Sequence, residues 1–267
     1  MKLARVRTID DRELVGSVHD DEVAVLDAVD VVAAATAPPT GERLLLADVR
    51  LLAPIARPPK FLAIGFNYAD HTAEFDAAPP AFPLVFNKQS TCVIGPGDGI
   101  EVPPESAMVD YEGELGVVIG QRCRRVVEAD ALDVIAGYLI VNDVSVRDWQ
   151  GRSPTMTLGK SWDTHGPIGP WLTTPDEVPD PQALRLRTIV SGETLQDAST
   201  ADMLTTVAQQ IAVLSTVMTL EPGDVIATGT PAGVGLARTP PRWVVPGDVV
   251  RVEIDGLGAL ENPVVAG

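Results

Sequence analysis

The sequence predicts a β-rich α+β fold, in which a small N-terminal domain precedes a larger second domain. Apolar runs of strand length recur along the 267 residues, and turn-forming residues separate them, among them 23 glycines and 23 prolines. Residues 202–220 are the clearest helix, with apolar positions at helical spacing. Many short strands without alternating helices favour a barrel or roll over repeated βα units. With 45% hydrophobic and 21% charged residues, the chain can bury a substantial core.

The charge and composition exclude several classes of function. A formal net charge of −17 would repel nucleic acids and anionic membrane surfaces, and no basic run interrupts it. Aromatic residues make up only 4% of the chain, which argues against a stacking platform for single-stranded nucleic acid. The N-terminus lacks the pattern of a signal peptide, and no apolar stretch approaches the ~18–20 residues of a membrane span. We therefore expect a cytoplasmic protein that binds neither nucleic acid nor membrane.

Residues 1–55 are expected to form the small β-rich N-terminal domain. Short apolar runs alternate there with turn material, which predicts two or three small strands and a short helix. Pro54, Pro58 and Pro59 mark a boundary of linker-like composition. The second domain is expected to occupy residues 58–265.

The first candidate site residues follow a predicted strand at Phe61–Ile64, which Gly65 ends. The next segment has a short helical pattern that contains His71 and Glu74. Residues three apart on a helix are neighbours, so Glu74 can hydrogen-bond His71, and a carboxylate that orients an imidazole produces a general base. An incidental pair on an exposed helical turn is the alternative interpretation. The proline-rich residues 76–83 that follow form either a hinge or lid or a surface loop.

Residues 109–120, which read VDYEGELGVVIG, form a strand with two carboxylates at its start. Side chains two apart on a strand point to the same face, so Glu112 and Glu114 are directed into one place. Two like charges so close together would repel each other unless a proton or a cation compensates them. A metal site and an edge strand charged against aggregation are both consistent with this stretch alone.

Further polar residues follow the apolar stretch 131–141. Asp143 comes at its end, and a carboxylate at the end of a buried strand is well placed to be a ligand. Polar residues then crowd two segments rich in turn formers, the usual composition of site-forming loops. They are Arg147, Asp148, Gln150, Lys160, Asp163 and His165.

The remainder of the chain is mostly structural in character. Residues 184–192 alternate with period two and predict a half-buried strand. Residues 229–235 form a glycine-rich loop after a strand, and its backbone N–H groups could cradle a carboxylate or phosphate. This loop lacks both the ending of a P-loop and the GxGxxG pattern of a dinucleotide site. Two or three strands close the chain.

Taken together, the motifs resemble the fumarylacetoacetate hydrolase family over residues 58–265, and in particular its bacterial acylpyruvase-like and 2-hydroxyhepta-2,4-diene-1,7-dioate isomerase-like members. Seven segments occur in the family's order: IGFNYADHTAEF, PLVFNK, VDYEGELGVVIG, GYLIVNDVSVRDWQ, LGKSWDTHGPIGPW, LEPGDVIATGTPAGVG and PGDVVRVEIDGLG. The resemblance implies a mixed β-roll catalytic domain, a small N-terminal domain and a homodimer.

The resemblance also implies a role for each candidate residue. A divalent cation, Mg²⁺ or Mn²⁺, would be bound by Glu112, Glu114 and Asp143, in agreement with the preference of hard cations for oxygen ligands. The implied catalytic residues are His71, Glu74 and Lys160. The implied substrate-binding residues are Arg147, Gln150, Asp163, Thr230 and Phe66. Phe66 stands where acylpyruvase-like members often have Arg and many bacterial members have Leu, so a positive anchor for a substrate carboxylate is expected to be missing.

The activity implied by the resemblance is hydrolysis of a C–C bond in a 2,4-diketo acid of the acylpyruvate or fumarylacetoacetate type. The substrate, a small 2-oxo acid, would chelate the cation, His71 would activate water, and a metal-bound pyruvate enolate would leave. Oxaloacetate decarboxylation and isomerisation of 2-hydroxyhepta-2,4-diene-1,7-dioate are alternatives on the same site, and the presence of both His71 and Glu74 favours hydrolysis. A non-catalytic binding protein is a remoter alternative, against which the intact set of site residues argues.

Overall fold

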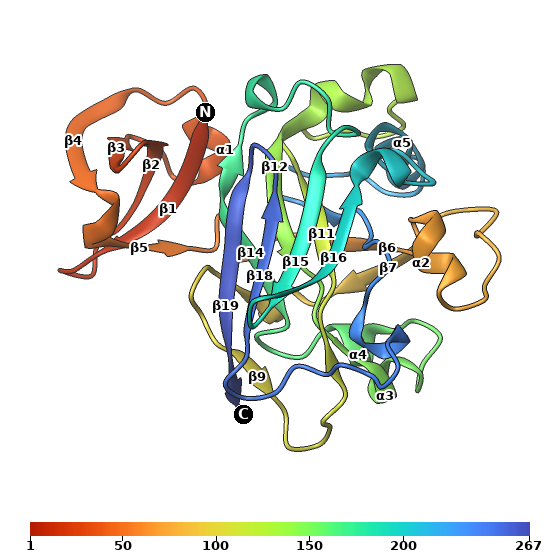
Figure 1. Cartoon of the computed structure of the whole chain (residues 1–267). Coiled ribbons are helices and arrows are strands. Elements are labelled where there is room, and N and C mark those ends of the chain that lie inside the picture. The colour runs from red at the N-terminus through yellow and green to blue at the C-terminus, as the bar shows by residue number, and fades with distance from the viewer.

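The first strands of the chain form a lobe at one side of the molecule, opposite α2 (Ala69–Ala73) in Figure 1. The computed structural model describes residues 1–267. The lobe consists of one short helix, α1 (Val31–Ala34), and five strands: β1 (Lys2–Thr8), β2 (Glu13–His19), β3 (Glu22–Leu26), β4 (Pro39–Leu45) and β5 (Val49–Leu52). The sequence predicted only two or three strands here, because β4 is largely exposed and carries no continuous apolar signal.

A mixed central sheet forms the middle layer. Its strands follow the order β14-β12-β11-β17-β6-β7, and β1 joins the lobe to it by pairing with β14 at Lys2 and Leu3. The β17–β6 pair is parallel and the other pairs in this order are antiparallel. The strands are β6 (Phe61–Gly65), β7 (Leu84–Lys88), β11 (Gly113–Ile119), β12 (Ile135–Asn142), β14 (Gly166–Thr173) and β17 (Val225–Ala227), and β8 (Val93–Ile94) pairs with β14.

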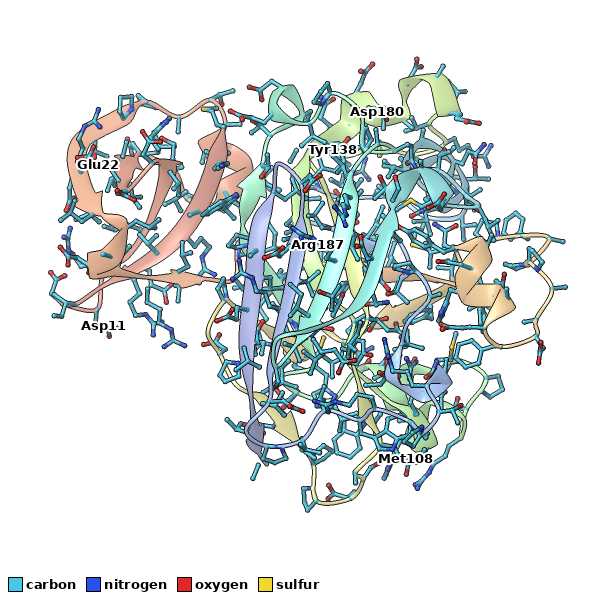
Figure 2. All side chains as sticks on the ribbon, in the orientation of Figure 1. Asp11, Glu22, Met108, Tyr138, Asp180 and Arg187 are labelled. Carbon is cyan, nitrogen blue, oxygen red and sulfur yellow. The ribbon has the colours of Figure 1, made fainter.

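A second sheet covers one face of the central sheet. Its order is β16-β15-β18-β19-β9, formed by β9 (Ile100–Val102), β15 (Arg185–Val190), β16 (Glu193–Ser199), β18 (Val249–Ile254) and β19 (Gly258–Ala266). β15 has buried and less buried residues in alternation, as its period-two sequence predicts. Figure 2 shows side chains filling the space between the layers, with Asp11 and Asp180 on the outside.

The predicted long helix is shorter than expected. α5 spans Val207–Val217 rather than residues 202–220. Thr206 caps its start: the Thr206 hydroxyl accepts from the Gln209 N–H, and the Gln209 side chain accepts from the Thr206 N–H. The remaining short elements are β10 (Val109–Asp110), β13 (Ser145–Val146), α3 (Arg147–Gln150) and α4 (Thr157–Lys160). None of the helices is long and apolar enough to cross a membrane.

Strand β11 lies at the centre of this arrangement and is buried along its whole length. Leu115, Val117 and Ile119 pack in the cluster that also contains residues of β15, β18 and α5. Val118 packs in the cluster on the other face of the sheet. Since alternate side chains point to opposite faces, Glu112 and Glu114 share the face of Val118, while Gly113 faces the second sheet.

Gly113 allows the second sheet to approach β11 at the level of the two glutamates. A Cβ at this position would overlap Thr188 Oγ1 and lie 3.0 Å from Val252 Cγ1. We predict that Gly113→Ala lowers the free energy of unfolding by about 1–3 kcal/mol, measured by urea denaturation, because overpacking forces the sheets apart.

Gly151→Ala is the matched control for this experiment. At Gly151 the only neighbour of an added Cβ is the Arg147 carbonyl oxygen at 4.0 Å, and its φ of −72° suits any residue. This variant is expected to change stability by less than about 0.5 kcal/mol. Equal stability of the two variants would show that β11 and the second sheet are not closely packed at Gly113.

Candidate active site

A cavity of about 400 Å³ opens at one end of the central sheet. It is lined by residues from β6, β7, α2, β11, α3 and α4, and from the loop after β17. Most of the candidate residues line it: Phe66, His71, Glu112, Glu114, Arg147, Gln150, Lys160 and Thr230. Segments far apart in the sequence therefore meet in one concave site.

Three buried carboxylates lie together at this site, of which Glu112 and Glu114 line the cavity. Each of Glu112, Glu114 and Asp143 offers an oxygen, and these atoms lie within 4.8 Å of one another. Asp143 is brought to the glutamates by the β11–β12 pairing, in which its N–H donates to the Glu112 carbonyl at 2.8 Å. β11 is paired on both sides, with β12 and β17, so the edge-strand interpretation of this stretch is wrong.

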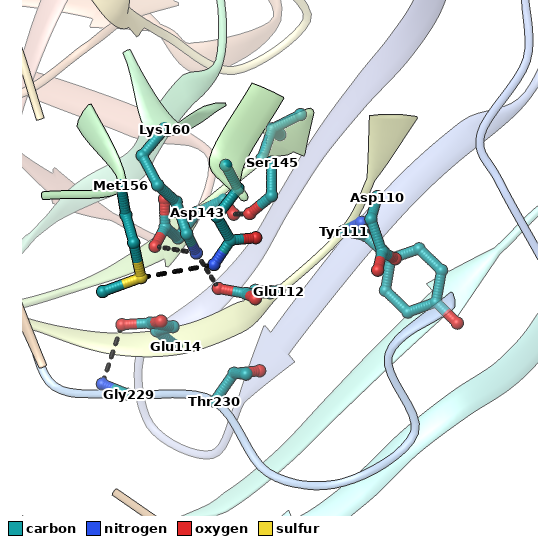
Figure 3. Close-up of polar contacts among 12 residues, drawn as sticks. Asp110, Tyr111, Glu112, Glu114, Asp143, Ser145, Met156, Lys160, Gly229 and Thr230 are labelled. Atoms are coloured by element: carbon teal, nitrogen blue, oxygen red, sulfur yellow. Dashed lines mark hydrogen bonds and ion pairs between the residues drawn. The ribbon is translucent and has the colours of Figure 1, made fainter. Parts of the chain in front are cut away.

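The two glutamates have opposite electrostatic environments. Burial alone would raise the pKa of Glu112, but the nearby Lys160 and Arg147 outweigh it and hold the pKa well below its usual range. Burial raises the pKa of Glu114 well above its usual range, and Asp143 and Glu112 raise it further. Glu114 accepts one hydrogen bond, from the Gly229 N–H at 2.8 Å, and forms no ion pair (Figure 3). The carboxylate cluster is thus short of positive charge beside Glu114.

The residues fit a hard divalent cation. Three carboxylate oxygens in a small buried cluster are the donor set that Mg²⁺ and Mn²⁺ prefer, and a cation there would relieve the repulsion that raises the pKa of Glu114. Such an ion would be held by Glu112, Glu114 and Asp143.

Two lysines fix the geometry of these carboxylates. Lys160 Nζ donates to Glu112 Oε2 at 2.5 Å and to Asp143 Oδ2 at 2.7 Å (Figure 3). Lys88 Nζ donates to the other oxygen, Asp143 Oδ1, at 2.6 Å, and also to the carbonyl of Lys160. The sequence did not identify Lys88 as a site residue, and the one available signal was that the chain has only four lysines.

Arg147 and Asp110 form a second support beside Glu112. Arg147 pairs with Glu112 Oε1 at 2.7 Å, and its Nε donates to Asp110 Oδ2 at 2.8 Å. Asp110 also accepts from the N–H groups of Gly235 and Leu236. Asp110 was missed in the sequence, although it stands two residues before Glu112 in the stretch 109–120 that the sequence predicts as a strand.

His71 and Glu74 form the pair that their spacing predicts. His71 Nδ1 lies 2.6 Å from Glu74 Oε1, and Glu74 Oε2 accepts from the Gly233 N–H at 2.9 Å. Because a carboxylate only accepts, Nδ1 carries the proton of the neutral imidazole and Nε2 keeps its lone pair. Glu74 therefore orients the base and fastens α2 to the glycine-rich loop.

The glycine-rich loop differs from the expected anion cradle. Its N–H groups at Gly229, Gly233 and Gly235 donate to Glu114, Glu74 and Asp110, which are carboxylates of the chain itself. Thr230 in the same loop donates to the Gly113 carbonyl at 2.9 Å. Gln196, also missed in the sequence, donates to the Thr230 hydroxyl at 2.8 Å. The loop thus positions the site residues of other elements.

The remaining candidates lie at the edge of the site or outside it. Gln150 lines the cavity and accepts from Arg147 at 3.0 Å, and the Phe66 ring stacks on His71 with centroids 5.4 Å apart. Asp163 is exposed and does not line the cavity, so the structure does not bring it to the other candidates. His165, one of the polar residues of the same loop segment, is buried outside the cavity, with Nε2 2.7 Å from the Glu101 carbonyl.

Comparisons with known proteins agree with this geometry. Residues 60–265 match the family model described as fumarylacetoacetate hydrolase C-terminal, and residues 1–54 match one described as Rv2993c-like, N-terminal. A protein of Burkholderia cenocepacia with the provisional name of a hydrolase is 50% identical over 249 residues, 92% of this chain and 86% of that protein.

Solved structures give the same result. The 2-hydroxyhepta-2,4-diene-1,7-dioate isomerase of Mycobacterium marinum is 39% identical with a TM-score of 0.86, over 100% of this chain and 98% of that one. The fumarylacetoacetate hydrolase of Exiguobacterium antarcticum is 36% identical with a TM-score of 0.88, over all of both chains. The expected mixed β-roll architecture with a distinct N-terminal part is confirmed.

We predict that a substitution of Glu114 in the carboxylate cluster has opposite effects on cation affinity and on the stability of the cation-free protein. Glu114→Gln keeps the acceptor for Gly229 but removes one of three neighbouring negative charges. We expect Mn²⁺ affinity, measured by isothermal titration calorimetry, to fall by at least ~10–100-fold. The cation-free variant should nevertheless melt at a higher temperature than the cation-free wild type, since the repulsion is relieved.

The exposed Glu105 provides the control for this test. Glu105→Gln removes the same charge far from the cluster and should leave both Mn²⁺ affinity and cation-free stability unchanged. Wild-type affinity in Glu114→Gln would show that Glu114 is not a cation ligand.

The buried His165 is expected to make the stability of the folded protein depend on pH. Burial lowers its pKa from 6.5 to about 4 in the folded protein. Between these values the unfolded chain takes up a proton that the folded protein does not, so stability falls as the pH falls from 6.5 to about 4. At 1.36 kcal/mol per pKa unit the loss is roughly 3 kcal/mol. His165→Gln should lose that much less stability over this range than wild type, while His19→Gln, at an exposed position, should follow wild type.

Proposed function

We propose, because this chain belongs to the fumarylacetoacetate hydrolase family, that it is a divalent-cation-dependent hydrolase that cleaves a C–C bond in a 2,4-diketo acid of the acylpyruvate type. The cation would be Mg²⁺ or Mn²⁺. We propose as well that the protein acts in the cytoplasm as a homodimer, for which the resemblance to the family is the support.

One observation carries the proposal: a carboxylate-oriented imidazole lines the same cavity as Glu112 and Glu114, two of the three carboxylates of the buried acidic cluster. The base is suited to activating water, and the cluster is suited to a cation. When bound, the cation would supply positive charge for the 2-oxo acid end of the substrate and for the negative charge that develops on its oxygens. An acidic chain needs such local positive charge to bind an anion at all.

The protein residues then have separate tasks. His71 Nε2 accepts a proton from water, and Glu74 holds the ring and stabilises the imidazolium that forms. The water oxygen bonds to C4 of the substrate, the C3–C4 bond breaks, and its electron pair passes to the pyruvate fragment. C3 of that fragment then takes up a proton, so the products are pyruvate and a carboxylic acid.

Lys160 and Thr230 complete the site around the reacting atoms. Lys160 keeps Glu112 and Asp143 in place and puts a positive charge at the cavity wall. Desolvation lowers the pKa of Lys160, but Asp143 and Glu112 raise it more, so the ammonium stays charged. Thr230 lines the cavity beside Glu114 (Figure 3), with its hydroxyl fixed by Gly113 and Gln196.

Isomerisation of a 2-hydroxy-diene dioate is the second candidate. It is supported by the similarity to the Mycobacterium marinum isomerase, at 39% identity. The same base would move one proton along the substrate, with no attack by water. Decarboxylation of oxaloacetate on this site would need neither the water nor the base.

The variant His71→Ala distinguishes acylpyruvate hydrolysis from oxaloacetate decarboxylation. We expect kcat for acylpyruvate hydrolysis to fall by about 10²–10⁴-fold, because a general base typically contributes that much. Oxaloacetate decarboxylation should largely survive, and Mn²⁺ affinity should stay unchanged. Pyruvate release is followed by a coupled assay for both substrates.

His19→Ala is the matched control, since His19 is exposed at the end of β2, and β2 lies in the lobe opposite α2 (Figure 1). It should retain wild-type rates. If both activities of His71→Ala fall together, His71 does not act by activating water. If neither substrate is turned over by wild type with Mg²⁺ or Mn²⁺, the hydrolase proposal is wrong.

A further inference from the structure

We propose that the site selects 2-oxo acids with one carboxylate and an apolar tail, and that it discriminates against dioates; this rests on the proposed function for the position of the 2-oxo acid end. The tail would lie along the half of the cavity that faces away from the carboxylate cluster. Phe66 is the central specificity residue of that half.

The lining of the cavity is partly apolar. Seven of its 16 lining residues are hydrophobic. Those that remain partly exposed at the mouth come from several elements: Phe66, Phe75, Leu84, Met156 and Leu236. The volume of about 400 Å³ corresponds to on the order of a dozen water molecules, which exceeds what a 2-oxo acid head group fills. Space therefore remains beside the apolar wall.

An aromatic cluster joins this wall to the base. The Phe66 and Phe75 rings lie 5.4 and 5.3 Å from the His71 ring, and 6.0 Å from each other. Phe66 follows β6 directly and has a φ of 51°, in the left-handed region that a phenylalanine rarely adopts. The local backbone thus directs this ring to the cavity, where a substrate group beyond the reacting carbonyl would meet it.

The charges at the carboxylate cluster are balanced for one substrate carboxylate. The buried ionic groups there are four carboxylates and three cations: Asp110, Glu112, Glu114, Asp143, Lys88, Arg147 and Lys160. With all seven groups ionised the sum is one negative charge, and a divalent cation, beside which Glu114 would be ionised, would change it to one positive charge. A single substrate carboxylate neutralises that charge, whereas a second would find no charge to balance it. Glu74, directly after α2, adds a further carboxylate beside His71.

The lining offers no free cationic or backbone donor for a second carboxylate, and the amide Nε2 of Gln150 donates to Met156 Sδ at 3.4 Å. Arg147 and Lys160 are the only arginine and lysine among the lining residues, and both are paired with Glu112. The N–H groups of Gly229, Gly233 and Gly235 already donate to carboxylates of the chain. A distal carboxylate would lose its water without gaining a partner, which is strongly unfavourable. An alkyl or aryl tail would instead be buried favourably.

The experiment compares substrates that differ only in the distal group. We expect kcat/KM for 2,4-dioxoheptanoate to exceed that for 2,4-dioxoheptanedioate by about 100-fold. It should also exceed kcat/KM for acetylpyruvate, which is two methylenes shorter, by about 100-fold, since each methylene in an apolar pocket contributes about tenfold. Equal kcat/KM for the heptanoate and the heptanedioate would overturn the inference and leave the proposed hydrolysis intact.

Binding is measured separately with acids that cannot be hydrolysed because they lack the 4-oxo group. In the presence of Mn²⁺, 2-oxoheptanoate should bind at least tenfold more tightly than 2-oxoheptanedioate in isothermal titration calorimetry. If this preference is found but no diketo acid is cleaved, the proposed function fails and the tail selectivity stands. If the dioate binds as tightly or more tightly, the selectivity fails.

Variants at Phe66 localise the effect. Phe66→Arg places a guanidinium at the apolar wall. We expect it to reduce the ratio of the affinity for 2-oxoheptanoate to that for 2-oxoheptanedioate by about tenfold or more. Phe66→Leu keeps the wall apolar and should keep the preference, although it loses the stacking on His71. An unchanged preference in a folded Phe66→Arg protein would show that Phe66 does not contact the tail.

Discussion

The site depends on the register of the β11–β12 pair. Gly113 lies opposite Asn142, and the Asp143 N–H donates to the Glu112 carbonyl at 2.8 Å. This register brings Asp143 to the face on which Glu112 and Glu114 project. A shift of one residue would move both glutamates to the opposite face, among the leucines and valines of the second sheet. The apolar residues of β11, buried on both faces, prevent such a shift. The packing of the core therefore also fixes the positions of the three carboxylates.

A buried cluster with unbalanced charge is unfavourable in the folded protein unless other groups hold it in place. Here the supporting groups are distributed over the fold: Lys88 comes from β7, Lys160 from α4, and Arg147 from α3. The glycine-rich loop adds backbone N–H groups, which lack side-chain freedom and so hold the carboxylates at little entropic expense. Glu114 alone forms no ion pair, and the need for a cation is concentrated on its side.

The parts of the site that the sequence predicts are those with local spacing. Glu112 and Glu114 are two apart on a strand, and His71 and Glu74 are three apart on a helical turn, so backbone geometry alone brings each pair together. Lys88 and Asp110 could not be assigned in this way, because their partners lie on other elements and only the tertiary structure brings them near. Asp163 shows the converse: its motif matches the family, but its loop turns it outward. The exposed β4 was missed for lack of an apolar pattern, and the start of α5 was set by the Thr206 cap rather than by periodicity.

Chemistry and selectivity meet at the junction of β6 and α2. Phe66 directly follows β6, His71 is the third residue of α2, and their rings are stacked. Glu74, on the same segment, fastens it to Gly233 of the glycine-rich loop. A substitution of Phe66 therefore changes the packing around His71 as well as the contacts with the apolar tail of the substrate. A chain that altered its tail selectivity through Phe66 would have to restore the support of His71 elsewhere, and Phe75, which already packs edge-on against the imidazole, is the residue placed to do so.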